Sequence, residues 1–138
     1  MKVRHIVWTA KQSLWMLTAV VLVSSPAYSF DERIKKELLR LEPTARLEQA
    51  CDTQLMSQIN KEHNQFRVDK VIAYTFSDPS YKGDSINAPG ASFRSRGDWY
   101  HLSYQCRTTP TRVEVKTLTY EIGEKVERDD WKKYSLYN

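Results

Sequence analysis

The chain has 138 residues, with 21 Lys and Arg residues against 17 Asp and Glu residues, and most of the excess of basic residues lies in one segment. Residues 1–29 hold three basic residues and no acidic one, so residues 30–138 carry 18 basic against 17 acidic side chains. Nucleic-acid binding depends on a basic face, and a nearly neutral total charge removes the main support for one, so we expect no nucleic-acid partner.

The first 29 residues have the features of an export signal. A cationic start precedes the apolar run Leu14–Val23, and small residues stand three and one positions before the bond between Ser29 and Phe30. The apolar run of about ten residues is shorter than the roughly 20 that a membrane-spanning helix needs, and an uncleaved anchor is the alternative. We predict cleavage after Ser29, one mature domain over residues 30–138, a periplasmic or secreted location and no stable membrane span after cleavage.

The mature chain contains two cysteines, Cys51 and Cys106. In a small exported domain an isolated pair indicates a disulfide, whereas two buried thiols or a metal-binding pair are the alternatives. No second pair of Cys or His residues stands at the spacing that would complete a zinc site. We therefore expect a disulfide, no metal and no cofactor.

Two helices are predicted before any strand. The first covers Asp31–Leu41, where apolar residues recur at helical spacing, and Pro43 is expected to close it. The second begins near Thr44 as the N-cap residue and frays around His63. Its apolar stripe has a four-residue repeat, made of Leu47, Cys51, Leu55 and Ile59.

Strands occupy the second half of the chain. Lys70–Phe76 is apolar on both faces and predicts a covered strand, whereas Ser77–Ala91 contains two Pro and two Gly residues and is expected to be irregular. Ser92–Arg96 and Trp99–Cys106 then predict a hairpin around Gly97-Asp98, a pair that suits a two-residue type II′ turn.

Alternation of side chains divides this hairpin into two faces. One face is apolar and includes Cys106, so a disulfide would join it to the apolar stripe of the second helix. The opposite, outer face carries four polar or aromatic side chains, which are Arg94, Arg96, Trp99 and His101.

The last predicted strand, Arg112–Ile122, changes the parity of its apolar residues near Lys116. Either a bulge restores the phase, or the outer face is also covered at that end. We favour cover by a short helix that begins at Asp129 and carries Trp131. These elements predict an α+β fold with an N-terminal helical pair packed on a four-stranded antiparallel meander, a short C-terminal helix and one disulfide.

Several runs of residues carry a family resemblance. They are Arg46–Asp52, Asp69–Pro79, Ala88–Tyr100 and Leu102–Cys106. In combination they are similar to the domain of unknown function family 930, over about residues 43–136. The resemblance implies exported or membrane-anchored proteins of alphaproteobacteria, a cell-envelope location and a domain with two cysteines, and it implies no activity.

Few residues could carry catalytic chemistry. The mature chain has two histidines, His63 near a helix end and His101 on a strand, and no Gly-x-Ser-x-Gly motif. Glu48 and Asp52, four apart on the second helix, could be a pair of acid/base carboxylates. Solvated residues or ion-pair partners for the outer-face arginines are the simpler interpretation, so we name no catalytic residue.

The outer hairpin face is the candidate binding site. Arg94 and Arg96 would present parallel guanidinium groups, with Trp99 and His101 beside them, which suits a carboxylate or a phosphate. In a purely structural interpretation the arginines pair with acidic residues of the domain, and Trp99 lies under the C-terminal helix.

The sequence therefore predicts a non-catalytic periplasmic interaction module whose partner is an envelope protein or an anionic envelope polymer. An alternative is a small inhibitor or ligand-binding protein that acts through residues 77–91, because a long irregular loop in a compact domain is often functional. A hydrolytic enzyme is a minor alternative, and it requires a pocket that brings His101 to a carboxylate.

Overall fold

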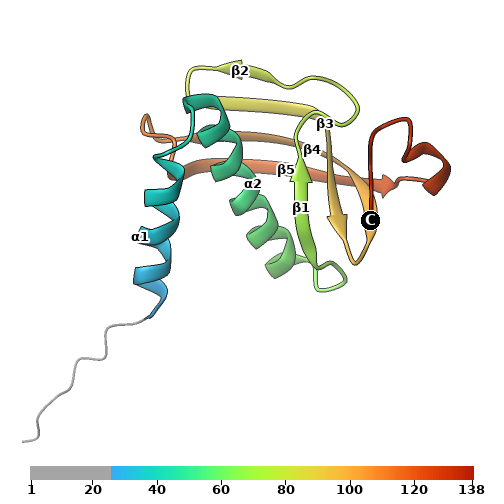
Figure 1. The fold of residues 1–138 in the computed structure, drawn as a ribbon, viewed down its shortest axis with the longest axis horizontal. Helices are drawn as coiled ribbons and strands as arrows, with labels where there is room; N and C mark the ends of the chain where they lie inside the picture. The colour runs from blue at the N-terminus through green and yellow to red at the C-terminus, as the bar shows by residue number, and fades with distance from the viewer. Residues whose placement is uncertain (1–25) are drawn as a thin grey trace, which may run out of the picture.

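A computed structural model describes residues 26–138, which form two α-helices and a five-stranded antiparallel sheet (Figure 1). Residues 1–25, and with them most of the predicted signal, lie outside the described residues. In chain order the elements are α1 (Pro26–Leu38), α2 (Pro43–Glu62), β1 (Val68–Ile72), β2 (Ser80–Lys82), β3 (Ser85–Ser95), β4 (Asp98–Thr108), β5 (Val115–Lys125) and the 3-10 turn η1 (Arg128–Asp130). The predicted α+β class is confirmed.

Helix α2 begins two residues earlier than predicted, because Pro43 opens it instead of closing the helix before it. The fixed φ of proline suits the first helical turn, and Glu42 rather than Thr44 is the N-cap residue. The helix ends at Glu62, and His63 follows as the C-cap residue, as the sequence predicted.

Helix α1 ends three residues before its predicted end, and Arg46 fixes the chain that follows. The Arg46 guanidinium donates hydrogen bonds of 2.9–3.1 Å to three carbonyl groups there, those of Leu38, Leu39 and Leu41. It donates another, of 3.2 Å, to the carbonyl of Thr111, so one side chain ties the connection between the helices to the turn before β5.

The sheet has the order β1-β3-β4-β5, which is the predicted meander, and β2 is an additional strand that pairs with β3. The prediction of an irregular Ser77–Ala91 segment is therefore wrong, because most of it forms β2, a turn at Gly83 with φ of 57°, and the first half of β3. Pro89 and Gly90 lie in a register shift within β3, between Ala88 and Ala91. They bend a strand rather than end it.

The turn between β3 and β4 consists of Arg96 and Gly97, and Ser95 pairs with Asp98. Both turn residues have positive φ, 53° and 82°, as a type I′ turn requires. The predicted Gly97-Asp98 turn is therefore wrong by one residue. Each β3 residue therefore pairs with a β4 residue two positions earlier than the predicted turn implies, and Arg94 lies opposite Trp99 instead of His101. Because a shift of two residues preserves the alternation of side chains, the predicted faces are unchanged.

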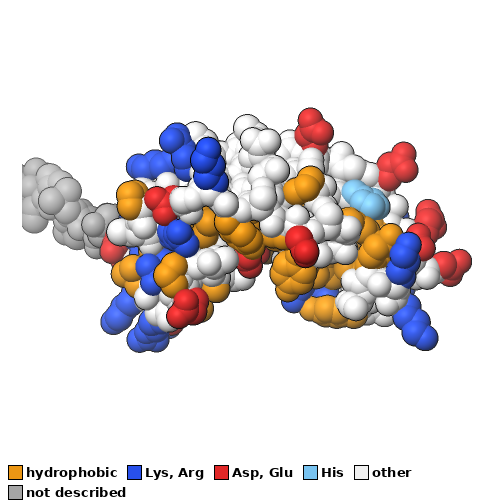
Figure 2. All heavy atoms as spheres, turned by 90° about the horizontal axis from the view of Figure 1, so that it is seen from above, with side chains coloured by type: hydrophobic (Ala, Val, Ile, Leu, Met, Phe, Trp, Pro, Cys, Tyr) orange, Lys and Arg blue, Asp and Glu red, His pale blue; other side chains and the backbone are white. Residues whose placement is uncertain are grey.

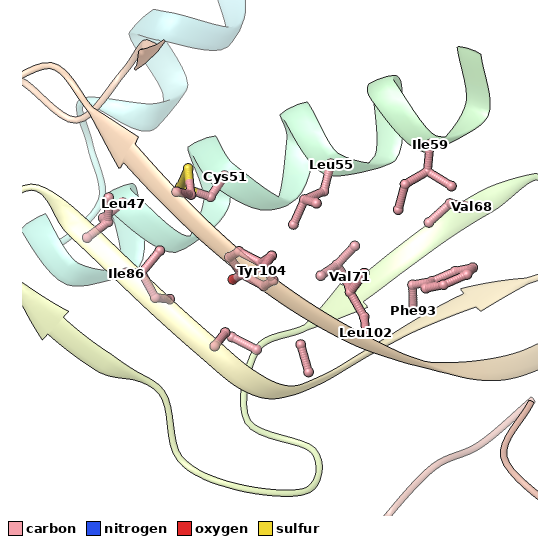
Figure 3. Close-up of a cluster of buried hydrophobic side chains, with 14 residues drawn as sticks. Leu47, Cys51, Leu55, Ile59, Val68, Val71, Ile86, Phe93, Leu102 and Tyr104 are labelled. Atoms are coloured by element: carbon pink, nitrogen blue, oxygen red, sulfur yellow. A yellow bond between two sulfur atoms is a disulfide. The ribbon is translucent and has the colours of Figure 1, made fainter. Parts of the chain in front are cut away.

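The core lies between α2 and the inner face of the sheet (Figure 3). All four residues of the predicted stripe, Leu47, Cys51, Leu55 and Ile59, are buried, and they pack against inner-face residues such as Phe93 and Leu102. The predicted disulfide is confirmed, because Cys51 and Cys106 are bonded with their Cα atoms 6.1 Å apart. It fastens α2 to β4.

Strand β5 runs from Val115 to Lys125, and a bulge corrects its phase. The register shifts at Lys116, since Arg107 pairs with Thr117 and Thr108 pairs with Val115. After this shift Leu118, Tyr120 and Ile122 pair with inner-face residues of β4 and pack against the core. The preferred explanation, cover of the outer face at this strand, is wrong, and the bulge alternative is correct.

The C-terminal segment (residues 126–138) covers a different part of the outer face, near the β3–β4 turn (Figure 1). The predicted C-terminal helix is only a 3-10 turn followed by further turns. The apolar residues of the C-terminal segment, Val126, Trp131 and Leu136, form a second buried cluster with Trp99. The indole N–H of Trp99 donates a 2.8 Å hydrogen bond to the carbonyl of Tyr137, which closes the segment over the sheet.

Candidate functional site

A cleft of about 600 Å³ lies at the β1 edge of the sheet, between α2 and the C-terminal segment. In Figure 2 the outline of the molecule is indented between the helical end, beside the grey trace, and the end that carries the C-terminal segment. The lining consists of Glu48, Gln49 and Asp52 of α2, residues 70–75, and Lys133, Tyr134, Ser135 and Tyr137. Three consecutive residues of β1, residues 70–72, line the cleft together with residues 73–75 of the turn that follows. Since consecutive strand residues point to opposite faces, the floor includes the edge of that strand rather than one of its faces.

Asp52 is a buried carboxyl group in the wall of this cleft. It is 9% exposed, and its Oδ1 accepts a long hydrogen bond of 3.4 Å from the hydroxyl of Tyr104. Burial and, to a smaller extent, the nearby charge of Glu48 together raise the pKa of Asp52 to about 7, although the Tyr104 hydrogen bond opposes both effects. Near neutral pH this group is therefore divided between its charged and neutral forms.

Glu48 lies one helical turn before Asp52 and contacts a second tyrosine. The hydroxyl of Tyr81, on β2, donates a hydrogen bond to Glu48 Oε1. Burial and the Glu48 carboxylate raise the pKa of Tyr81, and burial and the Asp52 carboxylate raise that of Tyr104. Both phenols therefore stay protonated at physiological pH and act as hydrogen-bond donors to the two carboxyl groups.

Two lysines bring positive charge to the same cleft. Lys70 Nζ lies 5.3 Å from the ring centre of Tyr137, and Lys133 Nζ lies 4.8 Å from that of Tyr134. Among residues 26–138, neither Lys70 nor Lys133 forms an ion pair within 4.0 Å, and neither does the carboxyl group of Glu48 or Asp52. The cleft thus combines acidic groups on α2 with basic groups on β1 and the C-terminal segment, each without a charged partner of opposite sign.

Residues 38–136 match the family described as Domain of Unknown Function (DUF930). The chain belongs to this family. The match confirms the resemblance seen in the sequence, and within the DUF930 domain lie α2, the whole sheet and the C-terminal segment as far as Leu136. No curated protein and no solved structure is significantly similar to the chain.

Two of the four outer-face residues have structural roles in this DUF930 domain. Arg94 donates hydrogen bonds of 2.9 and 3.0 Å from Nε and Nη2 to the two carboxylate oxygens of Asp69, and the pair lowers the pKa of Asp69. Trp99 is fully buried under the C-terminal segment. The purely structural interpretation of these two residues is therefore correct.

The other two outer-face residues are exposed but separated. Arg96 occupies the turn itself, and His101 stacks on Phe76 with ring centres 3.9 Å apart. Neither residue lines the cleft. The structure therefore does not assemble Arg94, Arg96, Trp99 and His101 into one exposed cationic and aromatic surface.

The cleft contains residues to which the sequence assigned lesser roles or none. Glu48 and Asp52 were expected to be solvated or paired with the outer-face arginines, yet Asp52 is buried and Arg94 pairs with Asp69. Their four-residue spacing was visible in the sequence, but the tyrosine partners were not, because each comes from a different strand. Within the described part of the chain, no group of three or more His, Cys, Asp or Glu residues is placed to hold a metal ion.

Proposed function

We propose that this protein is a non-catalytic binding domain, exported to the periplasm or the cell exterior, and that it binds its partner through the cleft at the β1 edge. Asp52 is the observation that carries the proposal, because it is a buried carboxyl group in a cleft wall with no cationic partner in the described structure. Burial penalises the charged form of such a group. A cationic group supplied by the partner would compensate that penalty.

The disulfide supports the proposed location. A disulfide between Cys51 and Cys106 is typical of oxidising compartments such as the periplasm and the cell exterior. No helix within residues 26–138 combines the length and apolar character that crossing a membrane requires. Of the two partners expected from the sequence, an envelope protein suits the cleft better than an anionic polymer, because the cleft carries both acidic and basic groups and a protein can present both charges whereas the polymer presents only one.

One observation favours a second candidate function, a hydrolytic enzyme. A carboxyl group whose pKa is raised to about 7, beside a second carboxyl group, is a pattern of general acid catalysis. Against this, Glu48 is engaged by Tyr81, and His101, on which the hydrolase prediction depended, does not line the cleft. Release of reducing ends or new amines from envelope polymers, lost in Asp52→Asn, would favour the enzyme.

The alternative of an inhibitory or ligand-binding loop over residues 77–91 takes a different form. Most of that segment pairs within the sheet as β2 and β3, and its Tyr81 bonds to Glu48 beside the cleft. Binding through this segment would therefore involve the cleft as well.

Capture from an envelope extract of the native host tests the proposal. The immobilised exported protein is compared with Asp52→Asn and with the matched control Glu124→Gln, an exposed carboxyl group on β5 outside the cleft. We expect a partner that the exported protein and the control retain equally and that Asp52→Asn retains at least about tenfold less, without a lower melting temperature. Equal capture by all three proteins would refute binding through the cleft.

A further inference from the structure

Strand β1 offers an unpaired edge inside the cleft. It is the first strand in the order β1-β3-β4-β5, and it pairs only with β3, so one row of its backbone N–H and C=O groups has no strand partner in the described sheet. At the start of the strand the side chain of Asn60 bonds to both backbone groups of Val68, so only the later part of the edge, beside the cleft, is open. α2 covers the inner face beside this edge, and the C-terminal segment covers the outer face. An extended peptide can add to such an edge through main-chain hydrogen bonds, and flanking walls then determine which peptide fits.

The charges of the cleft are separated by element. The carboxyl groups of Glu48 and Asp52 come from α2, whereas the ammonium groups of Lys70 and Lys133 come from β1 and the C-terminal segment. All four groups line one cavity, yet no acidic group lies within 4.0 Å of a basic one there. A ligand that carries an amine and a carboxylate a few bonds apart could pair with both sets at once.

The rest of the lining supports a ligand of peptide character. Tyr74 is 62% exposed beside the floor of the cleft, and Tyr134 and Tyr137 belong to the opposite wall. Aromatic rings offer apolar surface to aliphatic side chains and to the stems of charged ones. A volume of about 600 Å³ is in the range of small-molecule sites and can hold only a short segment.

We propose that the cleft binds a short peptide with a free amine and a free carboxylate, lying at the edge of β1 between the two walls, with the amine at Glu48 and Asp52 and the carboxylate at Lys70 and Lys133. This inference rests on the proposed function and names its ligand. It assigns the recognition of the amine to α2 and that of the carboxylate to β1 and the C-terminal segment.

Peptides of defined charge test the inference. Dialanine, trialanine and tetraalanine with free termini are titrated into the exported protein, and binding is followed by calorimetry and by chemical-shift changes. The same peptides with an acetylated amine or an amidated carboxylate are the matched ligands. We expect at least one free peptide to bind, and we expect either modification to weaken binding at least tenfold.

Variants then assign each charge to its wall. Asp52→Asn should weaken binding of the free peptide at least tenfold and remove the difference in affinity between the free and acetylated peptides. The double variant Lys70→Gln and Lys133→Gln should remove the difference between the free and amidated forms. The exposed controls Glu124→Gln and Lys116→Gln on β5 should change neither difference.

The outcomes separate this inference from the proposed function. If the amidated peptide binds as tightly as the free one, the ligand is simply cationic, and the two-charge inference is overturned while binding through the cleft remains supported. If no peptide binds but Asp52→Asn still abolishes partner capture, the ligand class is wrong and the proposed function stands. If no peptide binds and capture does not depend on Asp52, both are overturned.

Discussion

Asp52 of α2 meets Tyr104 of β4 directly beside the disulfide that joins these two elements. Asp52 follows Cys51 in the helix, Tyr104 precedes Cys106 by two residues on the same face of its strand, and the hydroxyl of Tyr104 lies 3.4 Å from Asp52 Oδ1. The covalent bond that stabilises the core therefore also fixes the position of the buried carboxyl group. The same disulfide therefore holds both the core and this wall of the cleft in place.

The raised pKa of Asp52 predicts a specific dependence of stability on pH. The group titrates near pH 7 in the folded protein and near 3.8 when unperturbed, so between these values the folded state holds a proton that the unfolded state has released. The free energy of unfolding should therefore fall as pH rises from about 4 to 7, by at most about 4 kcal/mol from this group, and should then level off.

Asp52→Asn isolates this contribution, because the amide has the same shape and does not titrate. We expect the variant to match the exported protein near pH 4 and to be the more stable of the two at pH 8, by a difference that develops between these values. Denaturant unfolding across the pH range measures it. Parallel curves for the two proteins would show that Asp52 ionises like an exposed carboxyl group.

Removal of the disulfide should lower stability without removing the fold class. The bond closes a separation of 55 residues, and the chain-entropy relation gives about 4 kcal/mol for a loop of that size. We expect the double variant Cys51→Ser and Cys106→Ser to unfold at a correspondingly lower denaturant concentration. Alkylation is the control, since the untreated exported protein should show no reactive thiol, and two reactive thiols would contradict the structure.

Arg94 and Arg96 should respond differently to substitution, although both were predicted for the same binding face. Arg94→Ala removes the paired hydrogen bonds to Asp69 and should lower the free energy of unfolding by about 1 to 2 kcal/mol, reduced by the exposure of that carboxylate. Arg96 has a φ of 53° in the turn, so Arg96→Asn should raise stability by about 0.5 to 1 kcal/mol. Equal effects on thermal unfolding would argue against the observed register.

Gly90 should tolerate no side chain. A Cβ atom there would lie 2.3 Å from the backbone nitrogen of Ser77, so Gly90→Ala should destabilise the protein by about 2 to 3 kcal/mol. Gly83→Ala is the matched control, because its φ of 57° is unfavourable for alanine but no atom lies within 4 Å. We expect a loss of only about 1 kcal/mol for the control in the same unfolding assay.

Much of the fold could be predicted because two periodicities agreed. The four-residue stripe of α2 and the alternation along β4 each placed one cysteine on a buried face, and the disulfide followed. The errors arose where a local signal had two physical meanings. Pro89 and Gly90 suggested a loop but bend a strand, and the parity change near Lys116 suggested cover but marks a bulge.

The candidate site was harder to predict, because it depends on contacts distant in sequence. The spacing of Glu48 and Asp52 placed them on one side of a helix, but their tyrosine partners come from β2, which was not predicted, and from β4. The basic groups of the cleft come from β1 and from the C-terminal segment. Only the docking of that segment over Trp99 turns the edge of β1 into the floor of a cleft.

Site-specific photo-crosslinking in the native host tests most directly whether the cleft or the outer hairpin face binds the partner. A photoreactive phenylalanine derivative is placed at Tyr74, which is exposed at the cleft, or at His101, which is exposed on the outer face. Binding through the cleft predicts an adduct from position 74 that Asp52→Asn abolishes, and no adduct from position 101. An adduct from position 101 alone would contradict it and return the binding site to the outer hairpin face.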